Sequence, residues 1–387
     1  MIVQVQNPRG STFDKQLTSA DWLRMMSDRD DVRGRQTDQR LCDPRLLQSI
    51  NAGETPLASL PPAQIDAARR AVHPYAALEA RCSLGTLAAV ELGHVDFLLR
   101  PVLGLLQQQP GSALRYVVQG SNGGAYADYI RWRASTVPGA PRPSGWCFAP
   151  GAVGPKAAGL EVVEGGADPL DLPAMDGFVR RVRGDDSGRD GVDLVVADGV
   201  DAHAGPSASL EKQLYAVVMA QAALALQVLR VGGSFVFRAV EATTPLSAEI
   251  LFLIQACFEG TAVVRSFASC PTGAERFVVC RGLVAGAGGV VPHLLAALAR
   301  IRDGQFKLAH LVSWTRVSAE RPFVDMVCKA NVSVAQAQID ALTAVATHAQ
   351  QQQKQQHVAA GNSFSDTQVD LASQCLRLWC LPAAGAA

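Results

Sequence analysis

The chain has 387 residues, of which 48% are hydrophobic, enough for one large core or for one core with a smaller appendage. Its 35 basic residues balance 35 acidic ones, so any surface for nucleic acid would have to be a local patch. The nine cysteines are scattered and never spaced C-x-x-C, which argues for reduced thiols and against a disulfide framework or a metal site.

The beginning of the chain lacks the basic and apolar regions of a secretory signal. No apolar run of about 18 residues is free of polar interruption, so no membrane helix is expected. We therefore expect an intracellular chain with no membrane partner, nuclear or cytoplasmic. No run of five or more basic residues marks a nuclear signal.

Residues 1–60 are polar and mixed in charge, and we interpret them as a lead-in that is partly helical. A helical pattern runs over residues 61–99 and is broken at His73-Pro74. Leu114–Gln119 then predicts a strand that leads into a glycine-rich turn and a helix. This arrangement lets backbone N–H groups approach a nucleotide-like ligand, although a tight strand-to-helix turn alone would use the same glycines.

The segment 192–283 organises the rest of the chain. Short apolar runs that end at Asp198, Arg238 and Cys280 predict buried strands, and the longer apolar segments between them predict helices. This alternation predicts a mostly parallel α/β sheet, in which chemistry lies at the carboxyl ends of strands. Asp198 and Arg238 stand at such ends, and Glu275 begins the last strand.

A glycine-rich stretch at 285–289 suggests a boundary. We therefore divide the chain into the lead-in 1–60, a main domain 61–284 and a helical C-terminal extension 285–387 that packs on the same domain. The densest basic clusters are Arg180-Arg181-Val182-Arg183 and the pair Arg131 and Arg133, which are candidates for phosphate contacts.

These pieces together resemble the FtsJ-type ribose 2′-O-methyltransferases, and most closely the cap-specific mRNA methyltransferase family. Ala197-Asp198-Gly199 stands where that family has Ala-Asp-Gly, and Glu275–Leu283 is similar to its last strand. The resemblance covers roughly residues 65–385. It implies a Rossmann-like fold that depends on S-adenosylmethionine (SAM), with a mostly parallel seven-stranded sheet flanked by helices. It also implies RNA, in particular capped mRNA, as the partner.

The resemblance further implies a catalytic tetrad of Lys, Asp, Lys and Glu, whose second Lys takes the proton of the ribose 2′-OH. Asp198 and Glu275 match the Asp and the Glu, whereas Glu91 and Arg238 stand at the two lysine positions. Burial can bring the pKa of a lysine toward neutrality, but an arginine stays protonated, with a pKa above about 12. Arg238 is therefore unsuited to be the base, and we expect these four residues to form an ion-pair network.

The family's cofactor turn reads A-G-P-G-G-F, and Ser121-Asn122-Gly123-Gly124-Ala125-Tyr126 stands in register with it. By resemblance, Gly120–Gly124 and Asp198 face SAM. Asn122 tolerates the left-handed backbone that a glycine supplies, but the methyl of Ala125 intrudes on the cofactor, so we expect binding to be weakened or lost. Asp168 is the first candidate for the acidic residue near the adenine, and Asp171 is the second.

Two functional hypotheses remain open. The chain is an active RNA 2′-O-methyltransferase with a substitute base, or it is a catalytically inactive relative that binds RNA or protein, for example an active paralogue. The tetrad and turn departures favour the second. A nicotinamide oxidoreductase is disfavoured because the G-x-G-x-x-G spacing is missing.

Overall fold

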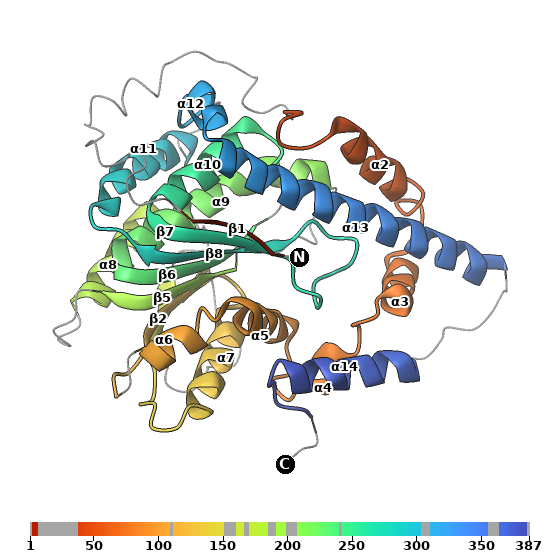
Figure 1. Cartoon of the computed structure of the whole chain (residues 1–387), viewed down its shortest axis with the longest axis horizontal. Helices are drawn as coiled ribbons and strands as arrows, with labels where there is room; N and C mark the ends of the chain where they lie inside the picture. The colour runs from red at the N-terminus through yellow and green to blue at the C-terminus, as the bar shows by residue number, and fades with distance from the viewer. Residues whose placement is uncertain are drawn as a thin grey trace.

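The computed structural model describes residues 2–6, 38–108, 111–150, 160–165, 170–184, 191–198, 207–239, 242–302, 310–354 and 364–384. Within these ranges the centre of the molecule is one sheet with the strand order β1-β7-β8-β6-β5-β2-β3-β4 (Figure 1). The strands are β1 (Ile2–Gln6), β2 (Arg115–Gln119), β3 (Ser144–Pro150), β4 (Leu160–Gly165), β5 (Val192–Ala197), β6 (Leu229–Ala239), β7 (Phe258–Val264) and β8 (Arg276–Leu283).

The sheet is parallel from β4 through β3, β2 and β5 to β6. Strand β8 lies antiparallel between β6 and β7. The predicted seven-stranded, mostly parallel sheet flanked by helices is thus confirmed by β2 to β8. The central strands β2 and β5 are buried along their whole length, which explains why they appear in the sequence as continuous apolar runs.

The N-terminal residues differ from the lead-in that we predicted from their polarity. Ile2–Gln6 form an eighth strand, which pairs antiparallel with β7 at the edge of the sheet. The alternation of Val3 and Val5 with Gln4 and Gln6 is typical of a strand, but it is too short to outweigh the polar residues that follow. The helical part of the prediction corresponds to α2 (Pro44–Glu54), which begins at the capping side chain of Asp43.

Helices cover both faces of the sheet (Figure 1). One hydrophobic core joins one face to the helices α8 (Leu172–Arg183), α9 (Ser207–Val228), α10 (Pro245–Ala256) and α11 (Val291–Arg302). The core on the other face contains α5 (Leu87–Leu99), α6 (Leu103–Gln108), α7 (Gly123–Ser135) and part of α14 (Asp366–Leu378). The sheet is therefore the middle of three layers, as expected for an α/β fold.

The C-terminal region contributes a long helix that packs against two helices from the beginning of the chain. The 34-residue helix α13 (Arg321–Lys354) packs against α2 and α3 (Pro62–Val72) around a third, smaller hydrophobic cluster. The remaining short elements are α4 (Leu78–Arg81), the 3-10 helix η3 (Ala287–Val290) and α12 (Trp314–Ala319). Among the described helices, none combines the length and the apolar character that a membrane span requires.

Candidate functional site

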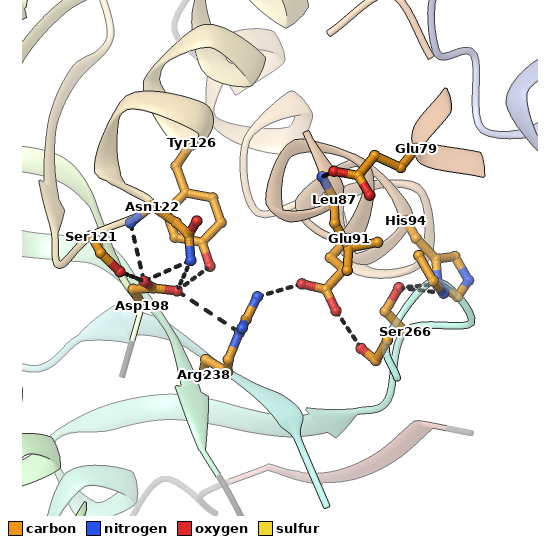
Figure 2. Close-up of polar contacts among 12 residues, drawn as sticks. Glu79, Leu87, Glu91, His94, Ser121, Asn122, Tyr126, Asp198, Arg238 and Ser266 are labelled. Carbon is orange, nitrogen blue, oxygen red and sulfur yellow. Dashed lines mark hydrogen bonds and ion pairs between the residues drawn. The ribbon is translucent and has the colours of Figure 1, made fainter. Parts of the chain in front are cut away.

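The four tetrad positions come together at the carboxyl edge of the parallel strands. Asp198 directly follows β5, Arg238 is the penultimate residue of β6, and Glu91 reaches the same place from α5 (Figure 2). Glu275 directly precedes β8. None of the four is more than 8% exposed. Three carboxyl groups and one guanidinium therefore share a buried environment, where an unpaired charge is costly.

Arg238 is bound to Glu91, the residue at the other lysine position. Its Nη2 donates to Oε2 of Glu91, and the hydroxyl of Ser269 donates to Oε1 of Glu91 at 2.6 Å. Burial raises the pKa of Glu91, and the charge of Arg238 opposes that rise. Burial also acts to lower the pKa of Arg238, but the surrounding oxygens of Tyr126 and the three carboxyl groups raise it above its ordinary value. The guanidinium is therefore a permanent cation and has no capacity to act as a base.

The carboxylate of Asp198 is surrounded by donors from the glycine-rich turn (Figure 2). It accepts hydrogen bonds from Ser121 Oγ at 2.9 Å, from the backbone N–H of Asn122 at 3.1 Å and from Tyr126 Oη at 3.1 Å. The side-chain amide of Asn122 lies 2.9 Å from Oδ1 and 2.8 Å from Oδ2. Arg238 Nε is 3.9 Å from Oδ1. The hydrogen-bonding capacity of Asp198 is therefore taken up by its own chain.

These donors stand at positions where the sequence resemblance predicts a departure from the family's turn. Ser121, Asn122 and Tyr126 are in register with an alanine, a glycine and a phenylalanine, none of which carries a side-chain donor. In this chain each of the three side chains donates to the same carboxylate. The departures in the turn are thus structurally coupled, as are the two at the lysine positions.

The backbone of the turn keeps features that a cofactor turn needs. Gly120 has φ +95°, and a Cβ there would lie 2.7 Å from Cβ of Asp198. A Cβ on Gly123 would lie 2.9 Å from Sγ of Cys147. The left-handed residue is therefore Gly120 and not Asn122, which has φ −88° and precedes α7. Both glycines are therefore required by close packing within the chain, and the polar side chains of the turn point at Asp198.

The other predicted site residues are dispersed. Asp168 lies outside the described residues. Asp171 caps α8, where its side chain accepts a hydrogen bond from the backbone N–H of Ala174 at 3.0 Å. Glu275 influences the pKa values of Glu91 and Arg238, but the described part of the chain offers it no hydrogen bond or ion pair. Within the described ranges, no group of three or more His, Cys, Asp or Glu side chains could hold a metal ion.

The predicted basic clusters are engaged in local ion pairs. Arg180 and Arg181 pair with Asp176 and Glu161, and Arg131 pairs with Asp128. The ion pair of Arg133 is with the buried carboxylate of Asp96, at 3.2 Å. Arg183 donates to the backbone carbonyl of Gln227. These arginines therefore hold helices in place, and their charges are largely offset within the chain.

A column of stacked rings next to the tetrad was not anticipated from the sequence. Trp379 stacks on His94 at 4.2 Å between ring centroids, His94 on Phe267 at 4.8 Å, and Phe267 on Tyr75 at 5.2 Å and 7°. Phe267 is 47% exposed and precedes Ser269, the hydroxyl donor to Glu91, by two residues. No local pattern identifies this column, because its members are distant in sequence.

His94 is held in its neutral form within the column. Its Nδ1 accepts a hydrogen bond from the backbone N–H of Phe267 at 3.2 Å and lies 3.2 Å from Ser266 Oγ. Burial lowers the pKa of His94 from 6.5 to about 4. Because the unfolded chain takes up this proton near pH 6.5 and the folded chain does not, the stability that His94 contributes is complete above pH 6.5 and is lost as the pH falls toward 4.

We expect acidification from pH 7 to pH 5 to lower the free energy of unfolding by about 2 kcal/mol through His94 alone. Urea unfolding at the two pH values measures this loss. In His94→Gln, which has no group that titrates in this range, the loss should shrink by the same amount. An equal acid sensitivity in both proteins would show that the proton uptake lies elsewhere.

Comparisons with known proteins agree with this architecture. Residues 155–283 match the family model of the FtsJ-like methyltransferases. The cap-specific mRNA (nucleoside-2′-O-)-methyltransferase 1 of Ailuropoda melanoleuca is 30% identical over 232 residues, which are 57% of this chain and 26% of that protein. The Homo sapiens protein of the same name is 25% identical over 379 residues, covering 88% of this chain and 42% of the relative.

The chain thus spans less than half the length of these curated relatives. Among solved structures, a ribosomal RNA methyltransferase described as putative, from Plasmodium falciparum, overlaps 51% of this chain and 97% of its own, with 13% identity and a TM-score of 0.39. Residues 155–283 thus resemble the FtsJ-like methyltransferases, and over most of its length the chain is similar to the cap-specific mRNA 2′-O-methyltransferases.

Proposed function

We propose that this chain uses the FtsJ-like fold as a binding scaffold for RNA and does not itself transfer a methyl group. The observation that carries the proposal is the paired nature of its departures from the family. Glu91 and Arg238 form one ion pair, and Ser121, Asn122 and Tyr126 all donate to Asp198. Arg238, at the position of the family's base, stays protonated and cannot take the proton of a ribose hydroxyl, and the oxygens of Glu91 are engaged by Arg238 and Ser269.

SAM is the cofactor that the family relationship suggests. The turn that begins at Gly120 would face it, and the cofactor would supply the transferable methyl when bound. The side-chain amide of Asn122 and the hydroxyl of Tyr126 face Asp198, so binding requires these contacts to open. We propose that SAM binds weakly or not at all.

RNA is the partner that the relatives' names suggest, and capped mRNA is the form to test first. Phe267 lies on the loop that also contacts Glu91, but both faces of its ring are stacked in the column, on His94 and on Tyr75, so only its exposed edge can contact an RNA. A protein partner, such as an active paralogue, is the alternative outcome.

Three measurements on the purified chain test the proposal. Calorimetry with SAM should show no micromolar binding, and capped RNA should acquire no labelled methyl group, whereas a short capped RNA should bind in a fluorescence anisotropy titration. Micromolar SAM binding that Asp168→Ala abolishes, together with methyl transfer, would overturn the proposal. If the chain fails to bind RNA but captures a protein partner, the scaffold binds protein and not RNA.

The contribution of the exposed ring can be measured separately. Phe267→Ala should weaken RNA binding by about 1 kcal/mol, because the exposed edge of the ring would lose apolar contact with the RNA. Val231→Ala is a matched control, because Val231 is also an exposed apolar residue but lies at the start of β6, at the opposite edge of the sheet. Equal RNA affinities for the two variants would show that the ring column is not part of the RNA site.

A further inference from the structure

A polar cavity lies near the start of β6, at the end of the parallel strands opposite to the tetrad. Its volume is about 670 Å³, within the range of roughly 300–1,000 Å³ that is typical of small-molecule sites. One wall is formed by the C-terminal end of α5 and by α6. The other wall is formed by the beginnings of β6 and β7 and the end of the neighbouring strand β8. Ser234 lines the cavity and Arg238 belongs to the tetrad, and the four residue steps between them along β6 correspond to about 13 Å.

Two arginines line this cavity from opposite walls. Arg100 follows α5, and Arg281 is near the end of β8. Within the part of the chain that the structure describes, neither guanidinium has an ion pair or a side-chain hydrogen bond, in contrast to the paired arginines of the basic clusters. Burial lowers the pKa of Arg281, and the charge of the buried Asp96 carboxylate opposes that fall.

Both walls are built by contacts that do not depend on a ligand. The buried carboxylate of Asp96 accepts hydrogen bonds from the backbone N–H groups of Val102 and Leu103 at 2.8 and 3.0 Å, which holds the bend that begins at Arg100. Arg100 itself has a left-handed backbone with φ 51°. On the other wall, Arg281 is paired with Ser234 across the β6–β8 ladder. The two guanidiniums are therefore carried by preorganised backbone.

One acidic side chain completes the polar lining. Glu259 begins the exposed part of β7, and its carboxylate lies where a side chain on Gly282 would be, with Oε2 2.8 Å from the position of that absent Cβ. Two cations and one anion leave a net positive charge. Gln107 adds amide groups, and Leu98 and Leu105 add apolar surface. The lining therefore suits an organic molecule with an anionic group and a hydrogen-bond donor.

We propose that this cavity binds a small phosphate ester, such as a sugar phosphate. The two guanidiniums hold the phosphate, because their planar donor pairs match its oxygens and together offset a double negative charge. A hydroxyl of the organic portion donates to Glu259. The site is separate from the tetrad, and its occupation does not require methyl transfer.

Ribose 5-phosphate is the first probe, because it has both groups and lacks the adenine that could direct a nucleotide to a cofactor cleft. Isothermal titration calorimetry should show saturable binding, and neutral ribose should not bind. Arg281→Gln and Arg100→Gln should each weaken the Kd by roughly tenfold or more, the loss expected for hydrogen bonds between charged groups. Arg45→Gln, at an exposed arginine of α2, is the matched control and should leave the Kd unchanged.

Glu259→Gln distinguishes recognition of the sugar hydroxyl from recognition of the phosphate. Binding of inorganic phosphate should become tighter, because a repulsive carboxylate is removed, and the advantage of ribose 5-phosphate over inorganic phosphate should decrease. Arg281→Lys keeps the charge but loses the planar fork, and it provides a second reading if Arg281→Gln has an altered thermal unfolding curve. The proposal is overturned if millimolar ribose 5-phosphate does not bind, if ribose binds as well, or if affinity is the same in the arginine variants and the Arg45→Gln control.

Discussion

Arg238→Met is expected to lower the free energy of unfolding by about 3–5 kcal/mol, the usual cost of removing one partner from a buried ion pair. The variant leaves Glu91 and Asp198 in a buried cluster that no longer contains a cation, since Glu275 adds only a further carboxyl group. Glu91 accepts one remaining hydrogen bond, from Ser269, which cannot offset a full charge. Urea unfolding monitored by circular dichroism measures the loss.

The double variant Glu91→Gln with Arg238→Met is the control that identifies the cause. Because it removes the stranded charge together with its partner, it should recover a substantial part of the stability, and the coupling energy of the cycle should exceed about 1 kcal/mol. Arg230→Met provides a comparison at a less buried pair, since Arg230 is 27% exposed in its ion pair with Asp193. If Arg238→Met costs no more than Arg230→Met, the Glu91–Arg238 pair does not stabilise the fold as argued.

Much of the architecture could be predicted from short patterns in the sequence. The apolar runs that end at Asp198 and Arg238 correspond to β5 and β6, and their parallel pairing places both residues at one edge. Strand β1 was missed because a five-residue alternation is a weak signal, and its partner β7 is more than 250 residues away. Pairing partners at such separations leave no local trace.

The contacts within the site could be predicted less well from the sequence. The sequence predicts an ion-pair network, but it does not say which carboxylate binds Arg238. The structure places Arg238 on Glu91. The reason is geometric, because Glu91 and Arg238 come from a helix and a strand 147 residues apart. Ser269, 178 residues from Glu91, likewise has no sequence signal that would connect it to the pair.

The coupling of the departures also explains how they could be tolerated. A lone Glu91 in place of a lysine would bury a third carboxylate, and a lone Asn122 would place an amide in the turn without a partner. Together with Arg238 and Asp198, both are satisfied. Buried polar networks stabilise a fold only when every member has a partner. The Glu91–Arg238 pair and the donors to Asp198 therefore each work as a structural unit, to which Glu275 does not belong, and single reversions of these paired residues toward the family should be destabilising.

A combined reversion should instead recover function. We expect Glu91→Lys and Arg238→Lys, introduced together with Asn122→Gly and Tyr126→Phe, to bind SAM at least about tenfold more tightly than the natural chain, equivalent to about 1.4 kcal/mol. The turn reversions remove the amide and hydroxyl that occupy Asp198, and the lysine reversions restore a side chain whose pKa burial can depress. Calorimetry with SAM and transfer of a labelled methyl group to capped RNA are the two measurements.

Partial reversions serve as the controls for this experiment. The lysine pair alone should leave Asp198 engaged by the turn, and the turn pair alone should leave no base, so neither should transfer a methyl group. Methyl transfer by the natural chain would contradict the scaffold proposal directly. If the fourfold variant folds but still fails to bind SAM, the loss does not originate in these contacts, and the acidic residue expected near the adenine, Asp168, becomes the next position to test. Because the four substitutions belong to two coupled groups, only their combination separates a locked site from one that has lost its cofactor pocket altogether.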